Sequence, residues 1–281
     1  MSVRTLADAR SSLRARDVRV AGVARRVNAE RVVLFGWSRA ILLQLAHPLI
    51  AAGVAEHSTF RGSAREVAAR LHHTVGAMLA LTFGTPASRD ETLERIRDIH
   101  RRVNGRLPAA VGPFAAGTPY SAEDPDLVLW VHVTLLDSIP LVYERFVSPL
   151  SDADRDAYCA EAAGTAVALG ARDHDVPRTW NAMRRLLEAV YGSDRIVVGP
   201  QARALAGAVL APGVPRPIAP VSALNRLVTI GLLPDPIRRQ YGYEWSDARE
   251  ERLRRTIAII GGVRRVLPGV LALWPHARTE A

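Results

Sequence analysis

The sequence predicts an all-α protein that folds as a single helical domain. Helix start and stop signals recur along the whole chain, whereas the alternating apolar and polar pattern of half-buried strands is almost absent. With 281 residues, of which 48% are hydrophobic and 23% charged, the chain is able to bury a large core. We expect an N-terminal helical extension at residues 1–27, followed by the helical domain at residues 28–281.

The first third of the chain is expected to hold three helices. Asn28 can cap the first, Pro48 restarts the second, and a Gly-Ser pair precedes the third. The helices are expected over residues 30–47, 48–56 and 64–83.

Two capping boxes mark later helix starts. An S-x-x-E motif at residues 88–91 and an S-x-x-D motif at residues 151–154 predict helices over residues 88–104 and 151–169.

Between these two helices, a stretch rich in Pro, Gly and Ala, residues 105–124, is expected to form a long loop. Residues 125–138 then form a helix that is apolar all round, which is typical of the centre of a domain. A separate short helix is expected to begin at Pro140.

The C-terminal part continues the helical pattern. Helices are expected from Arg178 to Tyr191 and over residues 200–210, and an apolar segment ends at Leu233. A basic helix is expected over residues 246–267. The proline-rich turn APGVPRPIAP is interpreted as a loop within one domain.

Composition excludes several classes of function. All 37 Lys and Arg residues are arginine, which excludes Schiff-base chemistry, pyridoxal-phosphate anchoring, the phosphate-loop lysine and serine/lysine hydrolases. Cys159 is the only cysteine, which excludes an internal disulfide, a cysteine zinc cage and an iron–sulfur cluster. This cysteine usage favours a cytoplasmic location.

Charge and hydropathy bear on partners. The net charge is +9, but arginines alternate with acidic residues and form no basic block, so no nucleic-acid partner is expected. Residues 32–55, the most apolar stretch, are interrupted by polar residues and a proline, so no spanning helix is expected. The C-terminal stretch RRVLPGVLALWPHAR could contact a membrane surface peripherally or dock on the core.

His100 is the first candidate site residue. It is the one polar member of an apolar stripe with helical spacing, the other members being Leu93, Ile96, Val103 and Leu107. An unpaired buried imidazole costs roughly 1–3 kcal/mol, so His100 must bond a core partner or bind a ligand. Spacing alone leaves both interpretations open.

Arg70, His73 and Thr74 form a second candidate group. Their spacing on the helix over residues 64–83 places them within reach of one another. A cation, an imidazole and a hydroxyl could hold an oxygen ligand or an anion, although a solvated helix shoulder is the alternative.

His132 and Glu56 complete the candidates. Leu129 and Leu136 flank His132 on its helix, which predicts a buried neutral imidazole able to coordinate a metal or bond a ligand. Glu56 closes a helix, and both a structural and a chemical role stay open for it. With eight histidines in the chain, a mononuclear histidine metal site stays open.

Five segments occur in a characteristic order: GWSRAILLQLAHPLIAAGVAEHSTFR, RLHHTVGAMLALTFG, RIRDIHRRVNG, YSAEDPDLVLWVHVTLLDS and YERFVSPLSDADRDAYCAE. This succession resembles the MpaB/rubber-oxygenase family, which includes the latex-clearing proteins, over residues 28–240. The resemblance implies a globin-related helical core that holds b-type haem. It also implies dioxygen chemistry on olefinic or isoprenoid carbon.

The resemblance assigns residues near the haem. His100, in DIHRRVNG, is similar to the family's axial histidine, and Arg70 and Thr74 resemble its distal arginine and threonine. His73 stands where rubber-cleaving members have a lysine, and an imidazole there could ligate the iron.

Two further residues match less closely. Glu56 is the nearest counterpart of the acidic residue proposed as a base in rubber oxygenases, at a shifted spacing. His132 resembles a family histidine near the haem that supports it without ligating the iron.

The expected function is therefore that of a haem-dependent oxygenase acting with dioxygen on a small apolar substrate. Two alternatives stay open. One is a non-catalytic haem-binding or sensor protein in which His73 and His100 both ligate iron, and the other is a haem-free helical protein of the same fold.

Overall fold

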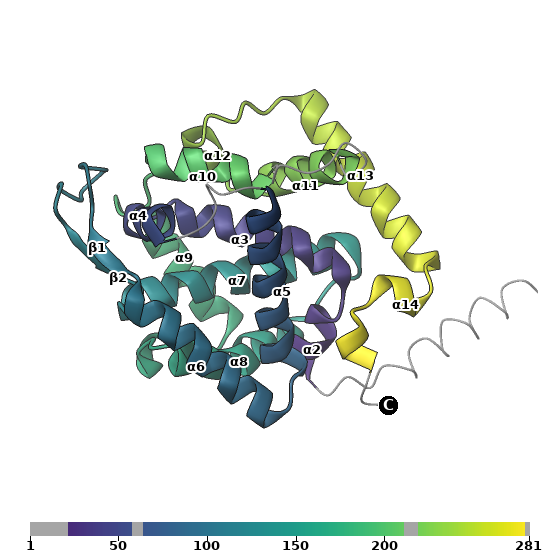
Figure 1. Cartoon of the computed structure of the whole chain (residues 1–281). Helices are drawn as coiled ribbons and strands as arrows, with labels where there is room; N and C mark the ends of the chain where they lie inside the picture. Colours follow the sequence, from purple (N-terminus) through teal and green to yellow (C-terminus); the bar gives the residue numbers. More distant parts are fainter. Residues whose placement is uncertain (1–21, 58–63, 211–218, 279–281) are drawn as a thin grey trace, which may run out of the picture.

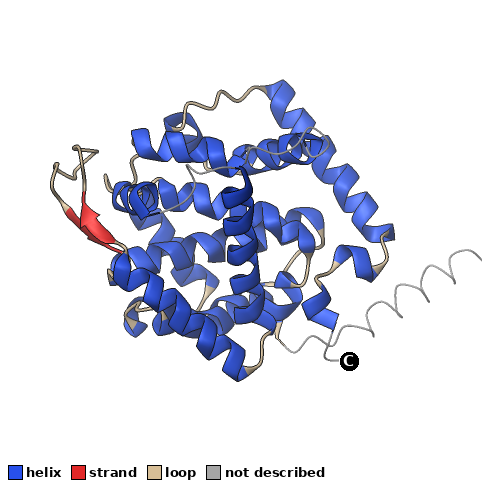
Figure 2. Ribbon diagram, in the orientation of Figure 1, coloured by secondary structure: helices blue, strands red, loops and turns tan. Residues whose placement is uncertain are grey.

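The structure is a computed structural model that describes residues 22–57, 64–210 and 219–278, with the backbone alone for residues 64–72. Over these residues the chain is helical apart from a short two-stranded hairpin, so the all-α prediction is confirmed (Figures 1 and 2). The elements are α2 (Val23–Asn28), η1 (Arg31–Val33), α3 (Leu34–Leu45), α4 (Pro48–His57), α5 (Ala64–Phe83), α6 (Pro86–Arg102), β1 (Asn104–Arg106), β2 (Pro119–Ser121), α7 (Pro125–Phe146), α8 (Asp152–Ala168), η3 (Asp173–Asp175), α9 (Trp180–Tyr191), α10 (Pro200–Leu210), α11 (Ala219–Gly231), α12 (Asp235–Gln240), α13 (Asp247–Val266), α14 (Gly269–Ala272) and η5 (Pro275–Arg278).

Helices α3 and α7 form the centre of the molecule, and the other helices surround them (Figure 1). They approach closely at Gly36, where an added Cβ atom would lie 2.8 Å from the carbonyl oxygen of Ser138. Trp130 on α7 donates its indole N–H to the carbonyl oxygen of Leu43 on α3, at 3.2 Å. Because these contacts combine a glycine with large apolar side chains, the two backbones can pack closely and bury most of both helices.

Helix α7 passes through Pro140, so the predicted break before this residue is wrong. Proline inside a helix removes a hydrogen bond at a cost of about 3 kcal/mol. The neighbouring Ser138, Ile139 and Val142 are buried, and this packing offsets the cost.

By length and composition α7 could cross a membrane, and so could α3 and α4 taken as one bent pair. Within the protein, however, 67% of the apolar window of α7 is buried, so most of this helix belongs to the core.

The helix starts show how capping signals are used. The predicted box at residues 151–154 is confirmed, because Ser151 Oγ accepts from the Asp154 N–H at 3.1 Å and Asp154 returns the bond. Helix α6 begins at Pro86, two residues earlier than predicted, with Thr85 as its N-cap. Proline suits the first helical position, so Ser88 becomes a first-turn residue whose N–H donates to Thr85 Oγ1.

The predicted loop over residues 105–124 is held together as a hairpin, which corrects the expectation of a plain loop. Its ends pair as antiparallel strands, with Gly105 opposite Tyr120. An added Cβ atom at Gly105 would lie 2.5 Å from the Tyr120 hydroxyl oxygen, so any larger residue here would displace the Tyr120 side chain. The hairpin packs against α4 and extends from the body of the molecule (Figure 1).

The chain ends bear on the remaining expectations. Residues 1–21 of the predicted extension and most of the proline-rich turn lie outside the described residues. Helix α2 runs across the expected boundary at residue 27, and Val27 belongs to the main core. The short helix α12 was not predicted, because the prolines at its start are also typical of a turn.

Several large apolar side chains on α13 and α14 are exposed: Ile259, Val263, Val266, Val270 and Leu271. Peripheral membrane contact and the cytoplasmic location stay predictions.

Candidate functional site

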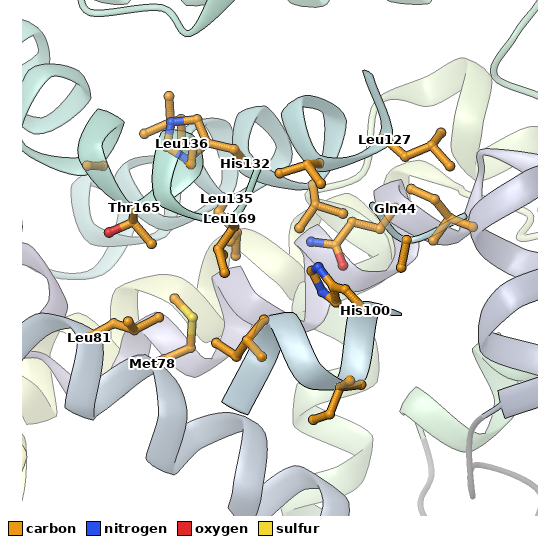
Figure 3. Close-up of a pocket in the computed structure, with 18 of the residues that line it drawn as sticks. Gln44, Met78, Leu81, His100, Leu127, His132, Leu135, Leu136, Thr165 and Leu169 are labelled. Atoms are coloured by element: carbon orange, nitrogen blue, oxygen red, sulfur yellow. The ribbon is translucent and has the colours of Figure 1, made fainter. Parts of the chain in front are cut away.

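A large cavity lies between α6, α7 and α8, with contributions from α2, α3, α4 and α5 and from the hairpin. Its volume is about 880 Å³, which is within the range of sites for cofactors and drug-sized ligands. Most of its wall is apolar, from side chains such as Met78, Leu81, Leu135 and Leu169 (Figure 3). The cavity is therefore suited to a large, mainly apolar molecule.

His100 enters this cavity from α6, near the C-terminal end of the helix (Figure 3). The side chain is half-buried, and its Nδ1 atom is buried without a hydrogen-bond partner among the described residues. Burial lowers the pKa of His100, against an opposing effect of Glu123. The imidazole is thus neutral at pH 7, which is the form that binds metal ions.

His132 lines the same cavity from the central helix α7. It is 8% exposed, and its Nε2 atom has no hydrogen-bond partner among the described residues. Burial lowers its pKa to about 4. The prediction of a buried neutral imidazole is confirmed, and a polar ligand atom in the cavity would supply the missing partner.

Gln44 adds a polar group that the sequence did not single out. Its side chain points into the cavity close to His100 in Figure 3. The amide Nε2 donates to Thr134 Oγ1 at 3.1 Å, and Thr134 donates to the Val131 carbonyl oxygen at 2.7 Å. This chain of bonds fixes the amide in place beside the histidine.

Glu56 lies at the exposed end of α4, where Tyr120 from the hairpin donates its hydroxyl proton to Glu56 Oε2. Burial, together with the hydrogen bond and charge of Glu56, raises the pKa of Tyr120. Tyr120 and the neighbouring His57 line the cavity, whereas Glu56 is outside its described lining. The carboxylate is thus held at the rim by a wall residue, and no signal in the sequence indicated Tyr120.

The candidates on α5 are placed differently. His73 and Thr74 are exposed and are absent from the described cavity wall, and the side chain of Arg70 lies outside the described residues. Thr74 shares a helix face with Met78 and Leu81, which do line the cavity one and two turns further on. The structure therefore brings His100 and His132 to one cavity but does not bring His73 and Thr74 there. The roles assigned to all three α5 residues stay predictions.

No group of three or more His, Cys, Asp or Glu side chains suited to a metal ion occurs among the described residues. Cys159 is buried, and burial raises the pKa of its thiol to about 12, so it is a core residue rather than a nucleophile. Among the features considered, the cavity with its two histidines gives the strongest support for a chemical function.

The lowered pKa of His132 predicts a specific acid sensitivity. Its unfolded pKa is about 6.5 and its folded pKa about 4, so between these values the unfolded chain binds more protons and the free energy of unfolding falls as pH falls. We expect His132→Gln to lessen this fall by up to about 1.4 kcal/mol per pH unit. Urea unfolding of both proteins between pH 7.5 and 4.5 measures the difference, and parallel curves would contradict the buried neutral assignment.

Comparison with known proteins bears on this site. The family model described as ER-bound oxygenase mpaB/B'/Rubber oxygenase, catalytic domain, matches residues 24–262, a range that holds nearly all of the described cavity wall. No curated protein and no solved structure matches the chain. Since the family model covers most of the sequence, the chain belongs to the mpaB/rubber-oxygenase catalytic-domain family of oxygenases.

Proposed function

We propose that this chain is a b-type haem-dependent oxygenase that acts with dioxygen on a small apolar substrate, isoprenoid or otherwise olefinic. The observation that carries the proposal is the neutral His100 imidazole in a large apolar cavity of an oxygenase-family chain. A haem-dependent mechanism also agrees with the absence of lysine and of a reactive cysteine, because the cofactor supplies the difficult chemistry.

The residues of the cavity fit a haem. The volume suffices for a large flat ligand, the wall is mainly apolar, and His100 and His132 each have a buried ring nitrogen without a partner among the described residues. His100 would hold the iron, because its neutral form is favoured by burial and its Nδ1 has no hydrogen-bond partner among the described residues. When bound, the haem supplies the iron centre at which dioxygen is activated.

The protein groups then have separate tasks. The apolar side chains of α7 exclude water and hold an apolar substrate. His132 and Gln44 offer hydrogen bonds inside the cavity. Glu56, which accepts a hydrogen bond from Tyr120, is assigned the uptake of a proton by resemblance to the family. Arg70 and Thr74 are assigned the stabilisation of charge on oxygen, by resemblance to the family.

The direct test is the visible spectrum of the protein expressed with a haem precursor, together with quantitation as pyridine haemochrome. We expect a Soret band and close to one haem per chain. A well-folded, colourless protein that also fails to take up added haemin would exclude the haem oxygenase and favour the haem-free alternative.

The bis-histidine alternative gives a second test. Since His73 is exposed and outside the described cavity wall, we expect His73→Ala to leave the ferric absorption spectrum of the haem-loaded protein unchanged. A change from a low-spin to a high-spin spectrum would instead make His73 the second iron ligand and favour the non-catalytic haem-binding or sensor function.

A further inference from the structure

One end of the cavity is basic. The half-buried Arg25 from α2 and the exposed Arg89 from α6 both line it. Arg89 precedes His100 on α6 by eleven residues, which is close to three helical turns, so the two side chains leave the same face of the helix. At about 1.5 Å per residue, their Cα atoms lie about 16 Å apart along the axis. The cavity thus has a histidine near one end of this helix and an arginine near the other.

Arg25 is held in place by the end of α5. Its Nη1 donates to the Thr82 carbonyl oxygen at 2.9 Å, and its guanidinium lies over the Phe83 ring at 5.1 Å from the centroid. Thr82 also lines the cavity, and the short turn after it leads directly into the first turns of α6, which carry Arg89. The turn between α5 and α6 therefore brings the two arginines to the same end of the cavity.

The nearby acidic group is already engaged. Glu161 is the one acidic side chain in the described cavity wall, and its two oxygens accept from the Val23 and Ala24 N–H groups at 3.0 and 2.8 Å. This carboxylate caps the N-terminus of α2. Glu161 is therefore held by the backbone of α2, while the side chains of Arg25 and Arg89 border a predominantly apolar wall.

We propose that Arg25 and Arg89 bind the carboxylate of the molecule that occupies the cavity. An occupant with a carboxylate at this end and an apolar body reaching toward His100 satisfies both the charge and the apolar wall. Arginine suits this task because its planar guanidinium matches a carboxylate. The carboxylate has two potential sources, a haem propionate or a long-chain carboxylic acid substrate, and the first source rests on the proposed haem function.

The test compares wild type with Arg89→Gln, Arg25→Gln and the matched control Arg95→Gln. Arg95 lies on the same helix, is exposed and is outside the described cavity wall. The probes are haemin, iron-free protoporphyrin IX, its dimethyl ester, oleate and methyl oleate. Binding is followed by porphyrin absorption and fluorescence and by quenching of tryptophan emission, and circular dichroism verifies the fold of each variant. If Arg25→Gln does not fold, Arg89→Gln carries the comparison.

We expect the Arg89 and Arg25 variants to raise the dissociation constant of the acid probe about tenfold while Arg95→Gln leaves it unchanged, as for loss of one charge-assisted hydrogen bond. The corresponding ester should bind wild type and variants alike. An effect on haemin and protoporphyrin identifies a propionate, and an effect confined to oleate identifies the substrate.

Equal affinities of wild type and variants for every acid, or no binding of any probe to wild type, would overturn the proposal. The two proposals fail separately. Haemin that binds equally well to all variants leaves the haem function intact, whereas oleate binding that depends on Arg89 in a protein unable to bind haemin leaves the carboxylate site intact.

Discussion

His100→Ala is expected to abolish haem retention while leaving the helical circular-dichroism signal unchanged. The substitution removes the one half-buried imidazole that α6 brings to the cavity, and with it the proposed bond to iron. The fold should persist, because His100 is only partly buried and its Nδ1 makes no hydrogen bond among the described residues. Pyridine haemochrome quantitation of the purified variant, with the helical signal beside it, measures both effects.

The matched control is His174→Ala. His174 lies in a surface turn, its side chain is 80% exposed, and it does not line the cavity. Its removal should leave the haem content at the wild-type level. Normal haem content in the His100 variant would contradict the axial assignment and turn attention to His132 as the ligand.

Asp137→Ala is expected to lower the free energy of unfolding by about 3–5 kcal/mol. Asp137 Oδ2 accepts from Arg39 Nη1 at 2.6 Å, and the Arg39 side chain is only 5% exposed. Without the carboxylate, the guanidinium keeps Ser138 Oγ and the Leu232 carbonyl oxygen as partners but loses its counter-charge. A buried, uncompensated charge is among the most destabilising defects in a core.

Urea unfolding at pH 7 measures the effect, with Asp173→Ala as control. Asp173 pairs with Arg178 at the surface, where both side chains are more than half exposed, so its loss should cost at most about 1 kcal/mol. The double variant Arg39→Met/Asp137→Leu should recover most of the lost stability, because apolar groups of similar volume replace a buried pair with little penalty. Similar losses for Asp137→Ala and Asp173→Ala would contradict the buried-pair interpretation.

The parts of the fold that the sequence predicted correctly depend on local chemistry. In the capping box, the side chains of Ser151 and Asp154 form hydrogen bonds with each other's backbone N–H groups. Because these bonds lie within four residues, the sequence pattern alone predicts them. The helix break predicted at Pro140 was wrong because packing against α3 decides whether a helix continues through a proline. The hairpin was missed because each strand is only three residues long and twelve residues separate the two strands. Tertiary contacts decide such features, and no local pattern records them.

The same division applies to the site. The apolar stripe on one helix predicted that His100 faces the interior but left open whether it meets a core partner or a ligand, and the structure places it in a cavity wall. Arg25, Gln44 and Tyr120 reach the cavity from three other elements, so only the packing of those elements brings them together. For Arg89 a signal did exist, its three-turn spacing from His100, but the residue is exposed and its place in the cavity wall depends on the packing of α5 and α2.

Helix α7 has a consequence for engineering this protein. Val131 and Leu135 line the cavity but are only half-buried, whereas Val133 on the opposite side is fully buried in the core. The cavity can therefore be reshaped at Val131 and Leu135 without changing the fully buried positions of the same helix. A library confined to Val131 and Leu135 would reshape the substrate space at small cost in stability, and it would leave intact the contacts by which α7 and α3 hold the domain together.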